Sequence, residues 1–226
     1  MHLSDRHYSV FRSNSLMCLI TFLLLATTSL LKAQNHTLVF FGDSLTAGYG
    51  LENPELESFP ALIQTKIAQE HLPWRVVNAG LSGDTTSGGL MRIDWILRQP
   101  LDIIFIELGA NDGLRGIAPQ TMASNLRSII NRIRSKQPRA TIVLAGMQMP
   151  INYGEAYRKA YTQAFADVAE NAKIVFEPFL LDGVGGVAAL NQADAIHPNA
   201  DGARVVADGV WKIIHSLLIK HDTPKR

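Results

Sequence analysis

Five apolar runs of strand length occur along the chain, and each is followed by a candidate helix. The runs cover residues 37–41, 75–78, 102–108, 141–145 and 173–176. Within the third, Ile103-Ile104-Phe105-Ile106 shows no polar alternation, which is typical of strands buried on both faces of a parallel sheet. The pattern therefore predicts a repeated β-α-β arrangement.

Three of the helical segments show a clear periodicity. Apolar residues recur at spacings of three and four within 59–67, 126–133 and 205–217. Pro100 and Pro138 are expected to end two of the chain's helices. Because the chain shows no internal repeat, linker or shift in composition, we predict one doubly wound α/β domain, a three-layer α/β/α sandwich.

Residues 1–33 have the pattern of a secretory signal. Arg6 and Arg12 precede an uncharged, largely apolar run over 16–31, and Ala33 supplies a small residue for cleavage. The run is shorter than the roughly 20 residues that a membrane-spanning helix requires. We therefore predict a cleaved signal at 1–33, a periplasmic or secreted location, and no membrane span after cleavage.

Two alternatives concern the same segment. Lys32 lies next to the expected cut and Asp5 reduces the leading positive charge, so an uncleaved N-terminal anchor also fits the pattern. Cys18, the one cysteine of the chain, could carry a lipid at a processed N-terminus. Ser15-Leu16-Met17 is a poor context for that modification, and the apolar run continues beyond it.

Charge and cysteine content exclude several classes of function. Positive residues outnumber negative ones in 1–33, so the formal charge of +1 for the whole chain becomes about −1 for the domain expected at 34–226. Such a domain has no basic field for nucleic acid. Because Cys18 falls within the predicted signal, the domain has neither a disulfide nor a thiol nucleophile.

Ser44 is a candidate nucleophile directly after the first predicted strand. The apolar run 38–41 leads into Gly42, which permits a sharp turn that would present the Ser44 hydroxyl at the sheet edge. The alternative is that Asp43 or Ser44 only caps the following helix, a common role for both residue types.

Asp194 and His197 are a candidate acid–base pair near the C-terminus. They lie three residues apart in a polar segment, and Pro198 restrains the backbone behind the imidazole. A neutral histidine can accept a serine proton through one ring nitrogen while the other donates to a carboxylate. Together with Ser44 the pair would form a catalytic triad. Taken alone, it could equally be a loop aspartate and a surface histidine.

The same chemistry needs donors for a developing oxyanion, and losing one such donor typically lowers turnover by about 10²–10³. Three are expected: the backbone amides of Ser44 and Gly80 and the side-chain amide of Asn111. Each follows one of the first three predicted strands, and the C-terminal ends of such strands meet at one crevice. Singly, Gly80 and Asn111 could be ordinary turn residues.

These motifs together resemble the SGNH (GDSL) hydrolase superfamily. The first block matches residues 41–50, the last matches the Asp-x-x-His-Pro motif at 194–198, and the resemblance runs from about Thr37 to the C-terminal helix. It implies a flavodoxin-like sheet of five parallel strands. It also implies a serine esterase that forms an acyl-enzyme through Ser44, His197 and Asp194.

Within the superfamily, residues 107–116 are similar to a bacterial periplasmic branch of thioesterases, lysophospholipases and arylesterases, and Asn152-Tyr153-Gly154 adds to that match. The resemblance implies small acyl ester or thioester substrates in a shallow crevice, with a mobile loop at 112–117 beside it. Residues 147–154 look shorter before Asn-Tyr-Gly than in the thioesterases, which favours the arylesterase side.

Substrate-contacting residues are expected in two segments. We predict Asp112, Gly113, Leu114, Arg115 and Ile117 from the first and Met149 and Ile151 from the second. Flexible methionine side chains suit a groove that accepts varied acyl chains. The same apolar residues, with Met147, could instead be ordinary core, and the sequence leaves both readings open.

Other kinds of site are not expected. The glycines of 42–48 are not followed by the lysine of a phosphate-binding loop, and 80–84 lacks the last glycine of a nucleophile elbow. His71 and His215 have no partners at metal-ligand spacing, so we predict neither metal nor cofactor. The remaining alternatives are a carbohydrate O-deacetylase of the same fold and a lipid- or glycan-binding module without turnover. A monomer is expected, because the apolar helix faces are needed to cover the sheet.

Overall fold

The computed structural model describes residues 36–222, so the predicted signal at 1–33 lies outside the described residues. The centre is a sheet of order β2-β1-β3-β4-β5 in which every pairing is parallel. Its strands are β1 His36–Gly42, β2 Trp74–Gly80, β3 Ile103–Glu107, β4 Thr141–Ala145 and β5 Val175–Glu177. The predicted five-stranded, flavodoxin-like order is confirmed.

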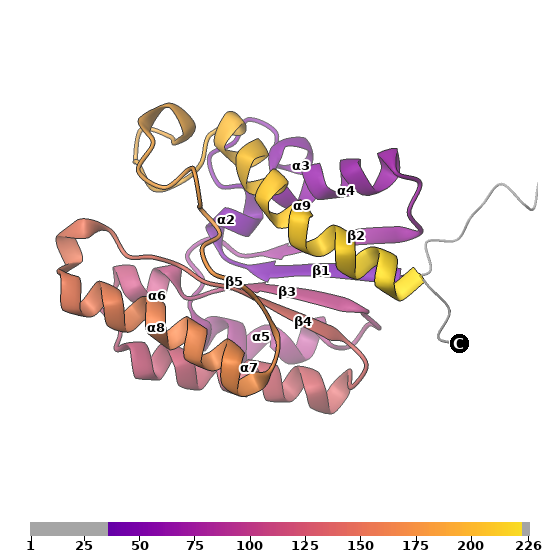
Figure 1. The fold of residues 1–226 in the computed structure, drawn as a ribbon, viewed down its shortest axis with the longest axis horizontal. Coiled ribbons are helices and arrows are strands. Elements are labelled where there is room, and N and C mark those ends of the chain that lie inside the picture. The colour runs from indigo at the N-terminus through magenta and orange to yellow at the C-terminus, as the bar shows by residue number, and fades with distance from the viewer. Residues whose placement is uncertain (1–35, 223–226) are drawn as a thin grey trace, which may run out of the picture. The chain divides into compact units, whose positions relative to one another are not determined.

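Helices cover both faces of this sheet (Figure 1). One face carries α4 Phe59–Gln69 and α9 Ala200–Asp222, and the other carries α5 Thr86–Ile96, α7 Pro119–Lys136 and α8 Glu155–Ala172. Shorter helices are α2 Ser44–Ala47, α3 Pro54–Glu57, α6 Ala110–Leu114 and the 3₁₀ helices η1 Ile151–Tyr153 and η2 Ala188–Leu190. The three predicted layers are therefore confirmed. Within residues 36–222, no helix is long and apolar enough to cross a membrane.

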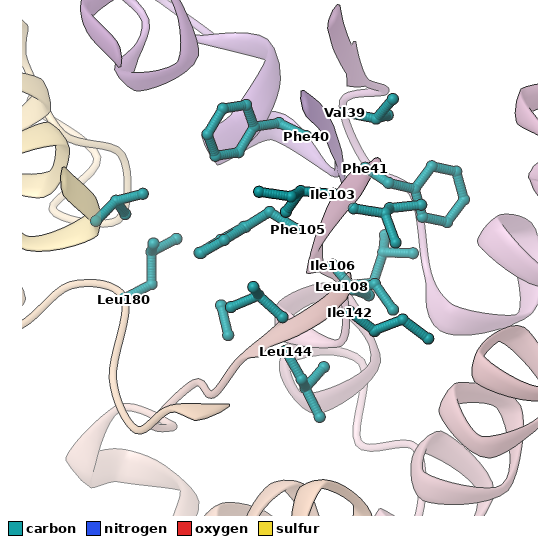
Figure 2. Close-up of a cluster of buried hydrophobic side chains, with 14 of the residues drawn as sticks. Val39, Phe40, Phe41, Ile103, Phe105, Ile106, Leu108, Ile142, Leu144 and Leu180 are labelled. Atoms are coloured by element: carbon teal, nitrogen blue, oxygen red, sulfur yellow. The ribbon is translucent and has the colours of Figure 1, made fainter. Parts of the chain in front are cut away.

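Strand β1 is buried on both faces, as its apolar sequence predicts. Figure 2 shows Phe40 and Phe41 pointing to opposite sides of the strand. The Phe40 ring meets the ring of Phe59 in α4 edge-on at 5.2 Å, whereas the guanidinium of Arg92 in α5 lies 4.1 Å from the centre of the Phe41 ring. Both phenylalanines are fully buried, so β1 is a rigid support for the residues at its C-terminal end.

Element ends differ from the predicted ones by one or two residues where local caps decide them. Strand β5 starts two residues later than the apolar run, because Lys173 caps α8 in the left-handed conformation with φ 49°. Helices α5 and α7 end before Pro100 and Pro138, as predicted.

The strand order fixes where a site can form. From β1 the chain crosses to β2 on one side and then returns to place β3 on the other side of β1. In a doubly wound sheet this reversal leaves a crevice beyond the C-terminal ends of the two central strands. Ser44 follows β1 directly, and Asn111 lies in α6 just after β3.

Candidate active site

Ser44 begins α2 at the end of β1. The Asp43 carboxylate caps this helix by accepting a hydrogen bond from the N–H of Leu45 at 3.1 Å. The tight turn needs glycine before it, because a Cβ on Gly42 would lie 2.0 Å from Oγ1 of Thr46 and 2.6 Å from Oε2 of Glu107. Local packing therefore holds the Ser44 side chain in one place, with 9% of the residue exposed.

The structure brings His197 and Asp194 to Ser44. Nε2 of His197 lies 2.9 Å from Oγ of Ser44, and Nδ1 of His197 lies 2.7 Å from Oδ2 of Asp194. An ionised carboxylate only accepts hydrogen bonds, so Nδ1 carries the ring hydrogen and Nε2 is left as the acceptor for the Ser44 hydroxyl. This geometry is what proton removal from Ser44 requires.

The loop that holds this pair is fixed by its own hydrogen bonds. Oδ1 of Asp194 accepts hydrogen bonds from the backbone N–H groups of Ile196 and His197 at 2.9 and 3.0 Å. Ala195, which follows Asp194, has a left-handed φ of 59°. Although desolvation raises the pKa of Asp194, hydrogen bonds from the N–H and ring of His197 outweigh it and lower that pKa to about 2. Asp194 is thus ionised at neutral pH.

Tyr49 covers the imidazole from the α2 side. Its ring centre lies 4.8 Å from that of His197, and its carbonyl oxygen accepts a hydrogen bond from Nε2 of Gln192 at 2.7 Å. The N–H of Gln192 also donates to the carbonyl of His197 at 2.8 Å. Gln192 therefore ties the loop of His197 to the segment after Ser44.

Two of the three expected oxyanion donors, the amides of Ser44 and Gly80, differ in their hydrogen bonds. The Ser44 N–H has no acceptor among the described residues, whereas the N–H of Gly80 donates to Oδ1 of Asn78 at 2.9 Å. Gly80 is glycine for a steric reason, because a Cβ there would lie 2.3 Å from the backbone nitrogen of Ala47. At the end of β2 the Gly80 amide is thus engaged by a side chain of its own strand.

Gly83, which the sequence analysis did not single out, has a free amide in the loop after β2. Within residues 36–222 its N–H has no hydrogen-bond acceptor, and its φ is +79°. It directly precedes Asp84, whose carbonyl accepts a hydrogen bond from Nδ2 of Asn111 at 3.0 Å. The same Nδ2 donates to Oδ2 of Asp43 at 3.1 Å. Asn111 is therefore held beside both Asp43 and the Asp84–Thr85 peptide.

Ser44, Asn111 and His197 open onto a cavity of about 630 Å³. The apolar part of its wall consists of Leu45, Leu114, Met147, Met149, Ile151, Phe179, Leu181 and Ile196. Met147 and Met149 are almost fully buried, while Ile151 is 83% exposed at the rim. The two methionines thus belong both to the core and to the cavity wall, which joins the two readings that the sequence left open.

Of the seven residues expected to contact substrate, Leu114, Met149 and Ile151 line this cavity and four do not. Asp112 is buried and accepts hydrogen bonds from the N–H and hydroxyl of Thr86. Gly113 packs under Met149, and Arg115 donates to the carbonyl of Gly83 at 2.9 Å. Ile117 is half-buried and its carbonyl binds Tyr157.

Residues 112–114 of the expected mobile loop at 112–117 belong to helix α6, and side chains of η1 and α8 hold the segment. The hydroxyl of Tyr153 donates to the carbonyl of Leu114 at 2.8 Å, and that of Tyr157 donates to those of Gly113 and Ile117 at 3.2 and 2.9 Å. These bonds tie the backbone of 113–117 to η1 and α8.

Three ionisable residues behind Ser44 were missed by the sequence analysis. Glu107 ends β3 and is 1% exposed, and Oε2 of its side chain accepts the N–H groups of Asp43 and Thr46. Arg92 pairs with Asp84 at 2.7 Å and donates to the carbonyl of Gly42 at 2.9 Å. A charged residue at the end of an unbroken apolar strand was the available signal for Glu107.

The two buried carboxyl groups near Ser44 have raised pKa values. Desolvation raises the pKa of Asp43 to about 6, against the hydrogen bonds from Leu45, Glu107 and Asn111 that lower it. Desolvation, followed by the charge of Asp43, raises the pKa of Glu107 well above its usual range. Within residues 36–222, no group of three or more His, Cys, Asp or Glu side chains could hold a metal ion.

Comparison with known proteins places this site in a family. Residues 40–205 match the GDSL-like Lipase/Acylhydrolase family. Esterase TesA of Pseudomonas aeruginosa is 40% identical over 83% of this chain and 92% of its own length. Thioesterase 1/protease 1/lysophospholipase L1 of Escherichia coli K12 is 34% identical over 90% of this chain and 95% of its own.

A solved structure agrees with the fold. The psychrotrophic esterase EstA from Pseudoalteromonas sp., in a form inhibited by monoethylphosphonate, superposes with a TM-score of 0.76 at 32% identity. The match covers 81% of this chain and 99% of that one.

Proposed function

The chain belongs to the GDSL-like lipase/acylhydrolase family and is an ester-hydrolysing enzyme, and from this premise we propose that Ser44, His197 and Asp194 are its catalytic triad. The observation that carries the proposal is the continuous contact from Ser44 Oγ through the imidazole to Asp194, at 2.9 and 2.7 Å, beside an apolar cavity. No other role of these three side chains accounts for both contacts and the cavity.

The geometry supports a two-step acyl transfer. Nε2 of His197 removes the Ser44 proton as Oγ attacks the ester carbonyl, and the imidazolium is stabilised by Asp194. The imidazolium then gives that proton to the departing alcohol or thiol, which leaves an acyl-enzyme. In the second step His197 takes a proton from water, the hydroxide cleaves the acyl-enzyme, and the proton returns to Ser44.

We propose that the oxyanion is bound by the N–H of Ser44, the N–H of Gly83 and the side-chain amide of Asn111. The free amides of Ser44 and Gly83 support this set, and Asn111 lies at the cavity wall. Nδ2 of Asn111 donates to Asp43 and to the carbonyl of Asp84, so binding an oxyanion would replace one of these two bonds. Donors held in advance at a water-poor site stabilise charge without reorganisation. Gly80, whose N–H is engaged by Asn78, is not part of this proposal.

Replacing the nucleophile tests the triad. Ser44→Ala should abolish hydrolysis of a p-nitrophenyl acyl ester and labelling by a fluorophosphonate probe, because no other group of the triad can form the acyl-enzyme. Ser82→Ala is the matched control, since Ser82 is an exposed serine of a neighbouring loop, and it should keep both properties. Labelling that persists in Ser44→Ala would refute the assignment.

The proposed substrates are small acyl esters or thioesters whose acyl chain lies along Leu114, Met149 and Ile151. The names of the relatives, an esterase and a thioesterase/lysophospholipase, support this class. Comparing a p-nitrophenyl ester, an acyl-CoA, a long-chain lysophospholipid and acetyl xylan under one condition identifies the leaving group. A preference for acetyl xylan would replace this proposal with a carbohydrate deacetylase. If none of the four substrates is hydrolysed, a binding module would replace it.

We also propose that residues 1–33 are a cleaved signal and that residues 34–226 form the periplasmic or secreted enzyme. The charged start, apolar run and small Ala33 support this proposal. N-terminal sequencing of the exported protein should begin at Gln34. An intact Met1 on exported protein would favour the uncleaved anchor.

A further inference from the structure

Two buried carboxyl groups face each other directly behind the proposed nucleophile. Asp43 ends the turn after β1 and is fully buried, and Glu107 ends the neighbouring strand β3 with 1% exposed. Oε2 of Glu107 accepts the N–H of Asp43 at 3.2 Å, the N–H of Thr46 at 3.3 Å and the hydroxyl of Thr46 at 2.7 Å. One carboxyl oxygen thus gathers donors from both sides of Ser44.

The remaining oxygens of the pair are not equivalent. Both Asp43 oxygens accept hydrogen bonds, Oδ1 from Leu45 and Oδ2 from Asn111, each at 3.1 Å. Oε1 of Glu107 is buried and has no hydrogen-bond partner among the described residues. A buried, ionised carboxylate oxygen without a donor is costly, whereas an undissociated acid carries no such charge. The proton of the pair therefore belongs on Glu107.

We propose that Glu107 is an undissociated carboxylic acid that donates to Asp43, so that the pair holds one negative charge and positions Ser44 and Asn111. Glu107 touches neither substrate nor reacting atoms and is a positioning residue. Its donated hydrogen holds the Asp43 carboxylate, which in turn holds the amide of Asn111. The inference rests on the proposed function, because Ser44 and Asn111 have their roles only there.

The charged surroundings favour a neutral Glu107. The cation that contacts this turn is Arg92 of α5. Its guanidinium forms an ion pair with Asp84 at 2.7 Å and donates hydrogen bonds to the carbonyls of Ala79 and Gly42. On the loop after η2, His197 faces Asp43 and lowers its pKa. On the α6 side, Asp112 is directed to Thr86 and adds no positive charge. No hydrogen bond or ion pair within residues 36–222 joins Glu107 to a cation.

Substitutions separate a neutral from an ionised Glu107. Glutamine has the same shape and, like the undissociated acid, offers one acceptor oxygen and a donor. Glu107→Gln should therefore keep kcat/KM at neutral pH within about threefold of the wild type. Glu107→Leu removes the acceptor of the Asp43 and Thr46 amides, and we expect kcat to fall by about 10²-fold with little change in KM, since misplacement of a nucleophile acts on the chemical step.

The outcome is read from the pair of variants. Activity of Glu107→Gln close to the wild type, with loss in Glu107→Leu, supports the proposal. A loss in Glu107→Gln as large as in Glu107→Leu overturns it, because the side chain would then be needed as an anion.

Infrared spectroscopy gives a second readout that does not depend on turnover and remains decisive if Glu107→Leu fails to fold. The folded wild type at neutral pH should show the C=O stretch of an undissociated carboxylic acid, and Glu107→Gln should lack it. Glu177→Gln, which alters a half-buried carboxyl at the end of β5, is the matched control and should retain the band. Absence of a band that Glu107→Gln removes overturns the proposal.

Ser44→Ala distinguishes failure of this inference from failure of the proposed function. It should keep the infrared band while losing hydrolysis. If Ser44→Ala stays active, the proposed function fails whatever the band shows. If it is inactive and the band is missing from the wild type, only the protonation of Glu107 is refuted.

Discussion

Gly80, the last residue of β2, and Gly83, three residues later, show how single residues of the same type differ. The sequence indicated Gly80 as an oxyanion donor, yet its N–H is bound by Asn78 and its missing side chain makes room for Ala47. The N–H of Gly83 is free among the described residues. Spacing along the chain could not separate them, because the decision depends on which acceptor the folded turn brings to each amide.

Alanine substitutions should separate the two glycines. Gly80→Ala forces a Cβ against the backbone of Ala47 and should cost about 1–3 kcal/mol of unfolding free energy. Gly83→Ala meets only the Arg115 side chain at 3.7 Å, so its cost in stability comes from the positive φ, about 1–2 kcal/mol. Alanine keeps the backbone N–H, but relief of the positive φ would turn that N–H away from the site, so we expect Gly83→Ala to lower kcat as well, measured with a p-nitrophenyl ester.

Gly116→Ala is the control for this comparison. Gly116 has a φ of +70° and nothing within 4 Å of an added Cβ, so the variant carries the backbone strain alone. It should lose stability as Gly83→Ala does and keep kcat. Equal kcat in all three variants would remove Gly83 from the oxyanion site.

Asp194 predicts a specific loss of stability in acid. Its pKa falls from 3.8 to about 2 on folding, so its ionised form stabilises the fold above about pH 4, and this contribution is lost as the pH falls toward 2. Urea unfolding across this range should show a steeper loss for the wild type than for Asp194→Asn. Asp201→Asn, at an exposed aspartate of α9, should behave like the wild type.

Helices α6 and α8 show what element prediction misses. The tyrosines at 153, 157 and 161 lie four residues apart, which indicates one face of a helix. Their hydroxyl partners are the carbonyls of Leu114, Gly113, Ile117 and Gly109, about 40 to 50 residues earlier in the chain. Because hydrogen-bond partners at such separation leave no local pattern, the sequence could not predict these contacts. The mobility of the loop at 112–117 stays a prediction.

Removing one tyrosine hydroxyl should loosen this contact. Tyr157→Phe loses bonds to Gly113 and Ile117 at 3.2 and 2.9 Å, which should lower the unfolding free energy by about 1 kcal/mol and Tm by about 2–4 °C. Calorimetry measures the shift. Tyr49→Phe, in which no hydroxyl bond among the described residues is lost, should leave Tm unchanged.

At the scale of the whole molecule, the architecture was readable from sequence and the cavity was not. Buried strands impose unbroken apolar runs, and helical crossovers between successive strands impose a parallel order, so the layers follow from the hydrophobic pattern. The wall of the cavity depends on which of several apolar side chains meet across the crevice. Leu114 and Met149 line the cavity, whereas Ile117 does not.

The covered faces of the sheet also predict a monomer. The apolar faces of α4, α5, α7, α8 and α9 are occupied by the sheet, but Met91 and Trp95 of α5 are 79% and 66% exposed. Isolated apolar residues of this kind are common on monomers. Sedimentation should give one monomeric species for the wild type and for Trp95→Gln alike. A dimer that Trp95→Gln dissociates would contradict this expectation.

Both ends of the described chain lie at the edge of the sheet opposite Ser44. His36 begins β1, and its ring is 6.3 Å from that of His221 near the end of α9, which also contacts Thr141 at the start of β4 (Figure 1). The seven residues of β1 separate this edge from the crevice by about 20 Å. A fusion partner or solid support joined at either end therefore leaves the crevice facing outward, open even to lipids presented in micelles.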